Sequence, residues 1–153
     1  AVEGSLFVAM GKKEIQKLTR NALDQYPAVV GINNHTGSKF AEKSQKLGYV
    51  FEVLAERGLF FIDSFTFKTS VAFETAQKAG IPTARRDIFL DNDLDEASIR
   101  AQFEVLVKAA MEQGSAIGIG HFHKPNTSKV LAEEIPKLKD AGIELVHASE
   151  LVQ

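Results

Sequence analysis

The fold of this chain is decided by residues 28–64, AVVGINNHTGSKFAEKSQKLGYVFEVLAERGLFFIDS. The apolar run at 28–32 predicts a strand that leads into a polar turn. Residues 41–57 repeat apolar side chains at helical spacing and stop at Gly58, a usual end for a helix. Residues 59–62 are apolar throughout and predict a second, buried strand. The stretch therefore predicts a strand, a helix and a strand in succession, from which parallel sheets are built.

The same alternation runs through the rest of the chain. Further strands are predicted at 6–10, 83–89, 116–119 and 143–146, and further helices at 13–23, 70–78 and 128–139. The clearest helix begins after Asp95, its predicted N-cap, and ends at Gly114. About five or six such units are too few to close an eightfold barrel. We therefore predict a single α/β domain over residues 1–153, an incomplete or distorted (β/α) barrel with a mostly parallel sheet that is truncated at the N-terminus and lacks its first strands.

Composition argues against several classes of protein. The 153 residues are 44% hydrophobic and 25% charged with a net charge of −2, so neither disorder nor binding to nucleic acid is expected. The chain has no cysteine, so its fold depends on neither disulfides nor thiolate-bound zinc. We expect no membrane-spanning segment and no secretion signal at the present start.

Three of the four histidines lie where an apolar run gives way to a polar turn. His35 follows the first strand of the quoted stretch, and His121 and His123 follow the strand at 116–119. Active sites of α/β folds form at the carboxyl ends of parallel strands. We therefore expect the polar residues that follow the strands to share one rim.

Four motifs, in this order, resemble the divergent polysaccharide deacetylase family: GINNHTGSKF, LFFIDSFT, ARRDIFLDND and SAIGIGHFH. The resemblance spans Ser5 to Val152. It implies a distorted (β/α) barrel and, through kinship with metal-dependent carbohydrate deacetylases, removal of N-acetyl or O-acetyl groups from an envelope polysaccharide. It also implies an extracytoplasmic location, periplasmic or secreted, with polysaccharide or acetylated oligosaccharide as the partner.

Two elements of the family pattern are missing. Members ordinarily begin with a strand ending in paired aspartates, a metal ligand and a general base, and no such strand precedes Leu6. Lys39 stands where better-known deacetylases have a second ligand histidine. Two functions therefore stay open. One is a metal-dependent deacetylase, or the catalytic-rim portion of one whose aspartate-bearing first strand lies upstream of Ala1. The other is a non-catalytic envelope protein that keeps the fold and binds glycan or a protein partner.

Hydrolysis of an amide or ester needs an activated water, a group that stabilises the oxyanion and a group that protonates the leaving group. The expected cofactor is a divalent metal. Zinc is favoured because it prefers histidine and carboxylate ligands. His35 is the first choice of ligand, and His121 and His123 are the others. Because these two alternate along the chain, they point to opposite faces if the strand continues through them. His121 is then the inward residue, as a ligand or as the general acid.

Asp63 and Arg86 complete the candidate catalytic residues. Asp63 either completes a metal site or orients a histidine through its second ring N–H, and Arg86 either holds an oxyanion or fixes Asp87. The candidate substrate-binding residues are Asn33, Asn34, Ser64 and Phe65. Phe65 and Phe67 are core residues by default, but sugar rings stack on aromatic faces that are exposed.

Structural roles are the alternative for these polar residues. The loop after the strand at 28–32 carries Asn33, Asn34 and Ser38. Their side chains are equally suited to cap the following helix and to bond backbone groups of the turn. The run Arg85, Arg86 and Asp87 is equally explained by ion pairs. Residues 91–93 resemble a loop with a helix cap and lack the ligand series of a calcium site. His147 is expected to be structural or exposed.

Overall fold

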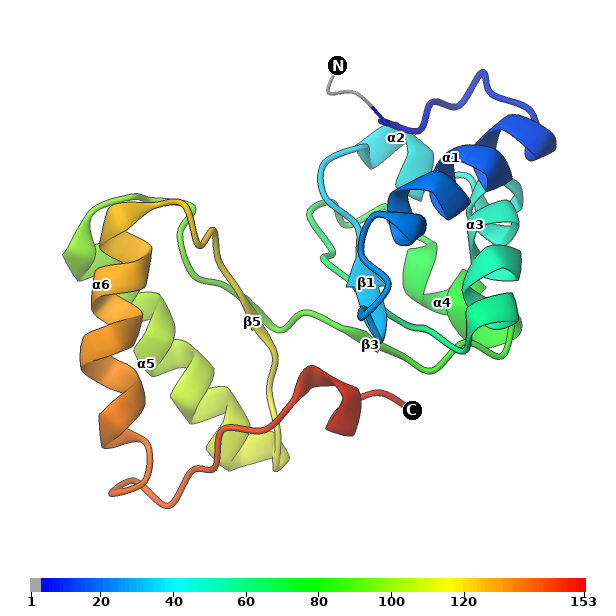
Figure 1. Cartoon of the computed structure of the whole chain (residues 1–153). Helices are drawn as coiled ribbons and strands as arrows, with labels where there is room; N and C mark the ends of the chain where they lie inside the picture. Colours follow the sequence, from blue (N-terminus) through cyan, green and yellow to red (C-terminus); the bar gives the residue numbers. More distant parts are fainter. Residues whose placement is uncertain (1–3) are drawn as a thin grey trace. The chain divides into compact units, whose positions relative to one another are not determined.

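The computed structural model describes residues 4–153, which form two compact units (Figure 1). Unit 1 contains the described residues up to Arg85 together with Val152 and Gln153, and unit 2 contains Arg86–Leu151. None of the helices in the described part of the chain combines the length and the apolar character needed to cross a membrane. The single domain inferred from the sequence stays a prediction, and each unit is described by itself.

Unit 1 is built on a parallel sheet in the order β1-β2-β3. The strands are β1 (Gly31–Asn33), β2 (Phe60–Asp63) and β3 (Thr83–Arg85). The register places Asn33 beside Ile62 and Asp63 beside Arg85. Because all three strands run the same way, their carboxyl ends meet at one edge, as predicted for the polar residues of this unit.

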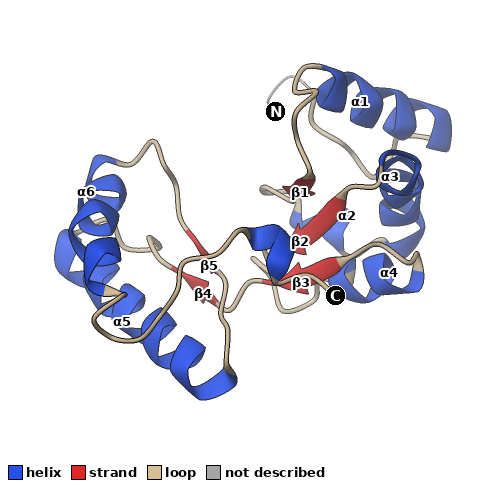
Figure 2. Cartoon of the chain, turned by 60° about the horizontal axis from the view of Figure 1, so that its bottom comes forward, coloured by secondary structure: helices blue, strands red, loops and turns tan. Residues whose placement is uncertain are grey.

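The helices of unit 1 gather on one side of its sheet in Figure 2. They are α1 (Lys12–Asp24), α2 (Ser38–Ala41), α3 (Ser44–Arg57) and α4 (Ala72–Lys78). The core between helices and sheet is apolar and includes Ile15, Phe51, Leu54 and Phe61. The rings of Phe51 and Phe61 meet edge to face with their centroids 5.0 Å apart, a favourable geometry for aromatic pairs.

Two predictions for unit 1 are wrong in detail. Residues 6–10 form turns instead of a strand, because their polar groups bond locally: the Met10 N–H donates to the Phe7 carbonyl (3.1 Å). The helix predicted over 41–57 is divided, since α2 ends at Ala41 and α3 starts at Ser44. The other elements are found with ends shifted by a few residues.

Unit 2 has a two-stranded parallel sheet of β4 (Ile88–Phe89) and β5 (Gly118–Ile119). Helix α5 (Glu96–Gln113) packs on β4, and α6 (Pro125–Glu134) packs on α5. Short 3₁₀ turns follow at η1 (Ile135–Lys137) and η2 (Ala148–Glu150).

The long helix of unit 2 begins and ends as predicted. Asp95 is the N-cap of α5, and its side chain accepts the Ser98 N–H (2.9 Å). Gly114 ends the helix with a φ of 87°, a conformation that glycine adopts without the steric cost of a Cβ. Ile99 and Phe103 of this helix are buried. Both ends of the helix with the clearest sequence pattern are therefore confirmed.

Three further predictions are corrected in unit 2. The strand predicted over 83–89 is two strands in different sheets, and the boundary between the units falls after Arg85. The strand predicted at 143–146 is irregular, because Ile143 bonds locally to Leu138 (3.0 Å) and no strand within residues 4–153 pairs with it. The last helix starts earlier than predicted and becomes 3₁₀ before Pro136, which has no N–H to donate.

The predicted fold class is confirmed. Both sheets are parallel, helices connect the successive strands within each sheet, and the sheets are not closed into a barrel. The arrangement is consistent with a partial, barrel-like (β/α) fold.

Candidate functional site

The strands of unit 2 bring Asp91 and His121 side by side. The register pairs Phe89 of β4 with Ile119 of β5, and Asp91 and His121 each follow the end of their strand at the same offset. In parallel strands, equal offsets place residues at the same edge of the sheet. The pairing extends past the strands, since the Leu90 N–H donates to the Ile119 carbonyl (2.8 Å).

The carboxylate of Asp91 is buried and makes three hydrogen bonds. Its Oδ2 accepts the backbone N–H of His121 (2.7 Å) and the hydroxyl of Thr127 (2.8 Å). Its Oδ1 lies 3.0 Å from Nδ1 of the His121 ring. Gly120 permits this approach, because a Cβ there would lie 3.1 Å from the Thr127 methyl group. Together the contacts fix the position and the orientation of the imidazole.

Hydrogen bonding keeps Asp91 ionised. Burial by itself raises the pKa of a carboxyl, because desolvation disfavours the charged form. The bonds from the His121 backbone, from Thr127 and from the His121 ring outweigh burial and hold the pKa of Asp91 below its ordinary value. A carboxylate beside Nδ1 favours the tautomer with its proton on Nδ1. Nε2 is then the atom at which the ring would exchange a proton with a substrate.

We expect Thr127→Val to destabilise the protein by about 1–2 kcal/mol near neutral pH. Valine keeps the shape of threonine but removes a donor to the ionised Asp91, so the folded-state pKa of Asp91 rises. A carboxyl with a lowered folded-state pKa stabilises the fold above its unfolded pKa and loses that effect as the pH falls through the folded pKa. Urea unfolding from about pH 7 to about pH 3 should show the deficit shrinking with acid.

Thr19→Val is the matched control for that measurement. Thr19 is also buried, but its hydroxyl donates to the neutral Ile15 carbonyl (2.8 Å). Its loss should therefore cost about the same at every pH. A Thr127→Val deficit that is equally independent of pH would contradict the assigned interaction with an ionised Asp91.

His121 and His123 lie in a turn, not in a strand. β5 ends at Ile119, and the Lys124 N–H donates to the His121 carbonyl (3.0 Å). The two histidines therefore do not alternate across a sheet. Their rings meet edge to face with centroids 5.4 Å apart, because the turn brings side chains together that a strand would separate.

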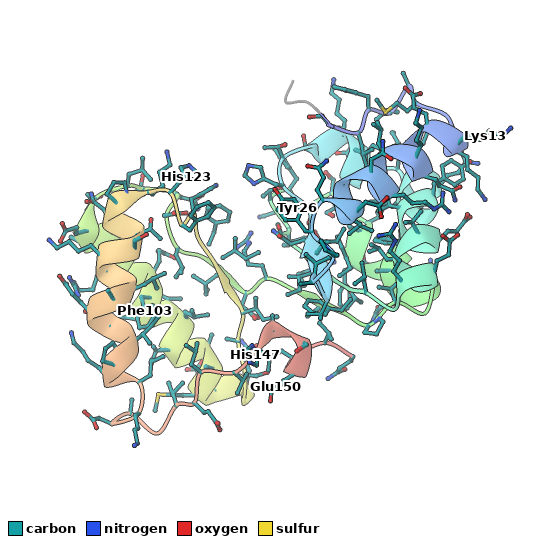
Figure 3. The ribbon with its side chains drawn as sticks, viewed as in Figure 1. Lys13, Tyr26, Phe103, His123, His147 and Glu150 are labelled. Carbon is teal, nitrogen blue, oxygen red and sulfur yellow. The ribbon has the colours of Figure 1, made fainter. Side chains whose placement is uncertain are left out.

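Four rings of unit 2, here called the aromatic row, contact one another in succession. The centroid of Phe89 lies 5.6 Å from that of His121, and that of His123 lies 5.8 Å from Phe122. With the contact between the two histidines, the row reads Phe89, His121, His123 and Phe122. Figure 3 labels His123 within it.

Asn33, Asn34 and Ser64 join the loops that follow β1 and β2 in unit 1. The Asn33 amide donates to the Ser64 hydroxyl oxygen (2.9 Å), and the Asn34 amide oxygen accepts the Ser64 N–H (2.7 Å). The Ser64 hydroxyl in turn donates to the Asn34 carbonyl. The structure thus brings three predicted substrate-binding residues together through bonds to one another, and their role toward a substrate stays a prediction.

Asp63 holds the loop between β2 and α4. Its buried carboxylate accepts the Phe65 N–H (2.9 Å), the Ser70 hydroxyl (3.0 Å) and the Phe73 N–H (3.4 Å). The Arg85 side chain lies next to it, with Nε 4.0 Å from Oδ2. That Nε is buried and has no hydrogen-bond partner within the described residues.

Phe65 is held in an unusual conformation beside Asp63. Its φ of 43° lies in the left-handed region, which is uncommon for a residue with a Cβ. The Arg85 guanidinium lies over its ring at 4.2 Å and over the ring of Phe73 at 5.0 Å. Arg85 also pairs with Glu74 (2.8 Å). These contacts fix Phe65 at the rim, where its predicted role is to bind substrate.

The other predicted residues are placed as follows. His35 is exposed in the turn before α2 in unit 1. The Arg86 guanidinium lies 5.2 Å from the centroid of the Phe89 ring, and Asp87 accepts the Ile117 N–H (2.7 Å). His147 is exposed and caps η2 together with Glu150 (Figure 3).

Metal ligation by His35, His121 and His123 stays a prediction, because the three histidines come from different units. Across the residues the structure describes, histidine, aspartate and glutamate do not gather in a group of three or more suited to a metal ion.

Sequence reasoning missed Asp91 and Thr127. Residues 91–93 were interpreted as a loop with a helix cap, and that role belongs to Asp95. The signal that was present is the equal offset of Asp91 and His121 from the ends of two apolar segments. Nothing in the sequence marks Thr127, whose contact with Asp91 depends on how α6 packs.

Comparison with known proteins gives one family and several relatives. The divergent polysaccharide deacetylase family matches residues 1–152. The uncharacterized protein YibQ of Escherichia coli (strain K12) is 38% identical over 143 residues, which cover 94% of this chain and 44% of YibQ. An uncharacterized protein of Haemophilus influenzae is 34% identical over 149 residues, or 97% of this chain and 52% of that protein. The chain spans about half the length of these curated relatives.

A solved structure shares the fold. The crystal structure of an uncharacterized protein from Agrobacterium tumefaciens C58 superposes with a TM-score of 0.93, at 24% sequence identity. The match covers 99% of this chain and 61% of that one. It supports the α/β architecture described above.

Proposed function

The chain belongs to the divergent polysaccharide deacetylase family, and we propose that it forms part of a hydrolase that removes acetyl groups from a polysaccharide or envelope glycan. The observation that carries the proposal is the bonding of His121 to the buried, ionised Asp91. A histidine oriented by an ionised carboxylate is well suited to acid–base catalysis of acyl transfer. An extracytoplasmic location is part of the proposal.

In the proposed reaction His121 is the acid and base. Nδ1 keeps its proton in the bond to Asp91, and Nε2 gives a proton to the nitrogen or oxygen that leaves the acetyl group. Asp91 fixes the ring and stabilises the positive charge that the ring carries when doubly protonated. Thr127 and the His121 backbone keep Asp91 ionised for this purpose. Arg86 is proposed to stabilise the developing oxyanion with its permanent positive charge.

The proposal includes a divalent metal, with zinc the first candidate. The family is related to metal-dependent deacetylases, and a cation of this kind supplies hydroxide near neutral pH by lowering the pKa of a water molecule. Imidazoles are suitable donors for zinc. His121 is a ligand only in place of its role as the acid, because Nδ1 is bonded to Asp91 and Nε2 cannot both bind a metal and give a proton. His35 and His123 are the other proposed imidazole donors, with His35 first.

Metal analysis and an acetate-release assay test this function together. We expect protein expressed with whatever sequence precedes Ala1 in its gene to retain about one divalent metal and to release acetate from acetylated oligosaccharides. His35→Ala should lose the metal. His121→Ala should lower acetate release by about 100-fold or more.

His147→Ala is the matched control, because His147 is exposed and caps a 3₁₀ turn. It should retain both metal and activity. If the His35→Ala variant retains one metal ion per chain, the assignment of His35 as a ligand is wrong. Oligosaccharide binding with no acetate release, in wild type and variants alike, would instead establish the non-catalytic glycan-binding alternative.

A further inference from the structure

Phe122 exposes its ring to solvent at the end of the aromatic row. It is 90% exposed, more than any other large apolar side chain in the described part of the chain. Burying a phenylalanine side chain contributes about 1.5–3 kcal/mol to folding, and this residue contributes almost none of that. A role in the fold therefore does not explain a phenylalanine at this position.

The backbone that carries Phe122 is held in place. Its carbonyl accepts the Ser128 hydroxyl from α6 (2.8 Å), and the Lys124 N–H donates to the His121 carbonyl (3.0 Å). α6 begins directly afterwards with Pro125, whose fixed φ suits the first helical turn. An exposed ring on an ordered backbone loses little conformational entropy when a ligand covers it.

The surroundings of Phe122 favour a carbohydrate. Its neighbours in the sequence, His121, His123 and Lys124, carry hydrogen-bonding groups, and the ring of His123 meets the Phe122 ring edge to face at 5.8 Å. A pyranose ring presents the matching surface, with C–H groups on its face and hydroxyls on its edge. The edge-to-face contacts of His123 with Phe122 and with His121 connect the phenyl ring to the Asp91–His121 pair through His123.

We propose that Phe122 is a sugar-stacking residue for the substrate of the deacetylase reaction. It binds a pyranose unit next to the one whose acetyl group reacts at His121, so the site selects an oligosaccharide over a single sugar. This inference rests on the proposed function for the identity of the reaction. It does not rest on that function for the binding of sugar, which can be measured without catalysis.

A tryptophan at position 122 provides that measurement. The chain contains no tryptophan, so Phe122→Trp introduces one fluorophore and preserves an aromatic face. With tetrameric N-acetylglucosamine as the probe, we expect a saturable change in its emission, and a weaker response to the monomer. Met111→Trp is the matched control, because Met111 is 65% exposed on α5 of the same unit; its emission should not change. No response at position 122, or equal responses from both variants, would overturn the proposal.

Kinetics separate this inference from the proposed function. Phe122→Ala should raise KM for the acetylated tetramer by about 3- to 10-fold, the range expected for loss of one aromatic contact, with a smaller change in kcat. Phe122→Trp should restore KM. If Phe122→Ala releases acetate with an unchanged KM, the stacking role of Phe122 is contradicted and the proposed hydrolase function is not. Sugar-dependent fluorescence in a protein that releases no acetate contradicts the reaction and supports Phe122 as a glycan contact.

Discussion

Asp91→Asn should lower acetate release by a factor on the order of 10³–10⁴, because it removes the charge that orients His121. Asparagine has nearly the same shape as aspartate, but its NH₂ group cannot accept a hydrogen bond. His121 would then lose the bond that keeps the proton on Nδ1, and the doubly protonated ring would lose its counter-charge. The loss of activity should appear in kcat if sugar binding is unchanged.

The same substitution should destabilise unit 2. Three donors converge on the Asp91 carboxylate from the His121 backbone, the His121 ring and Thr127. An amide can satisfy only part of this set, and we expect a loss of about 2–4 kcal/mol in urea unfolding. Relative to the wild-type protein, amide hydrogen exchange should become faster in residues 86–151 and change less in residues 4–85.

Asp95→Asn is the control for loss of one negative charge from the same unit. Asp95 caps α5, and asparagine caps a helix about as well as aspartate. The control should keep both stability and activity within experimental error. If Asp91→Asn behaves like Asp95→Asn in both measurements, Asp91 has no role in holding His121.

Asp63→Ala should lower the free energy of unfolding by about 3–5 kcal/mol. The buried carboxylate accepts bonds from Phe65, Ser70 and Phe73 and lies beside the Arg85 guanidinium. Alanine would leave those donors without an acceptor and a buried arginine Nε without its neighbouring charge. Urea unfolding should show the loss, and hydrogen exchange should place it in the loop between β2 and α4.

Glu74→Gln tests the other carboxylate that contacts Arg85. Glu74 is half exposed and pairs with Arg85 at 2.8 Å, and a pair of this kind contributes about 1 kcal/mol or less. The hydrogen bond that the Glu74 carboxylate accepts from its own backbone, followed by the bond it accepts from Arg85, lowers the pKa of Glu74. The small contribution of the pair should therefore fade in acid. Equal losses from Asp63→Ala and Glu74→Gln would show that burial does not decide the effect.

The sequence predicted the parallel α/β class because strand and helix periods alternate clearly in it. It also predicted that polar residues follow the strands, and the structure joins Asn33, Asn34 and Ser64 at one such edge. What it did not indicate is that those side chains bond to one another. Hydrogen-bond partners in loops depend on register and packing, which a single sequence does not encode locally.

The division of the chain into two units was also beyond the sequence. Residues 83–89 carry no glycine or linker composition at the boundary after Arg85, so they were interpreted as one strand. The strand predicted at 143–146 failed for a related reason. An apolar run forms a strand only if another strand pairs with it, and Ile143 bonds back to the preceding turn instead.

Gln153, the last residue of the given sequence, pairs with the first residue of β3. Thr83 and Gln153 exchange two backbone hydrogen bonds, of 2.9 and 3.2 Å. In connectivity, the segment Arg86–Leu151 is therefore an insertion whose entry and exit are both anchored at one strand. Anchoring both ends closes a long loop, which reduces the entropy of the unfolded insertion. Cutting after Leu151 would turn a closed loop into a tail and remove that constraint without touching any residue of the Asp91–His121 pair.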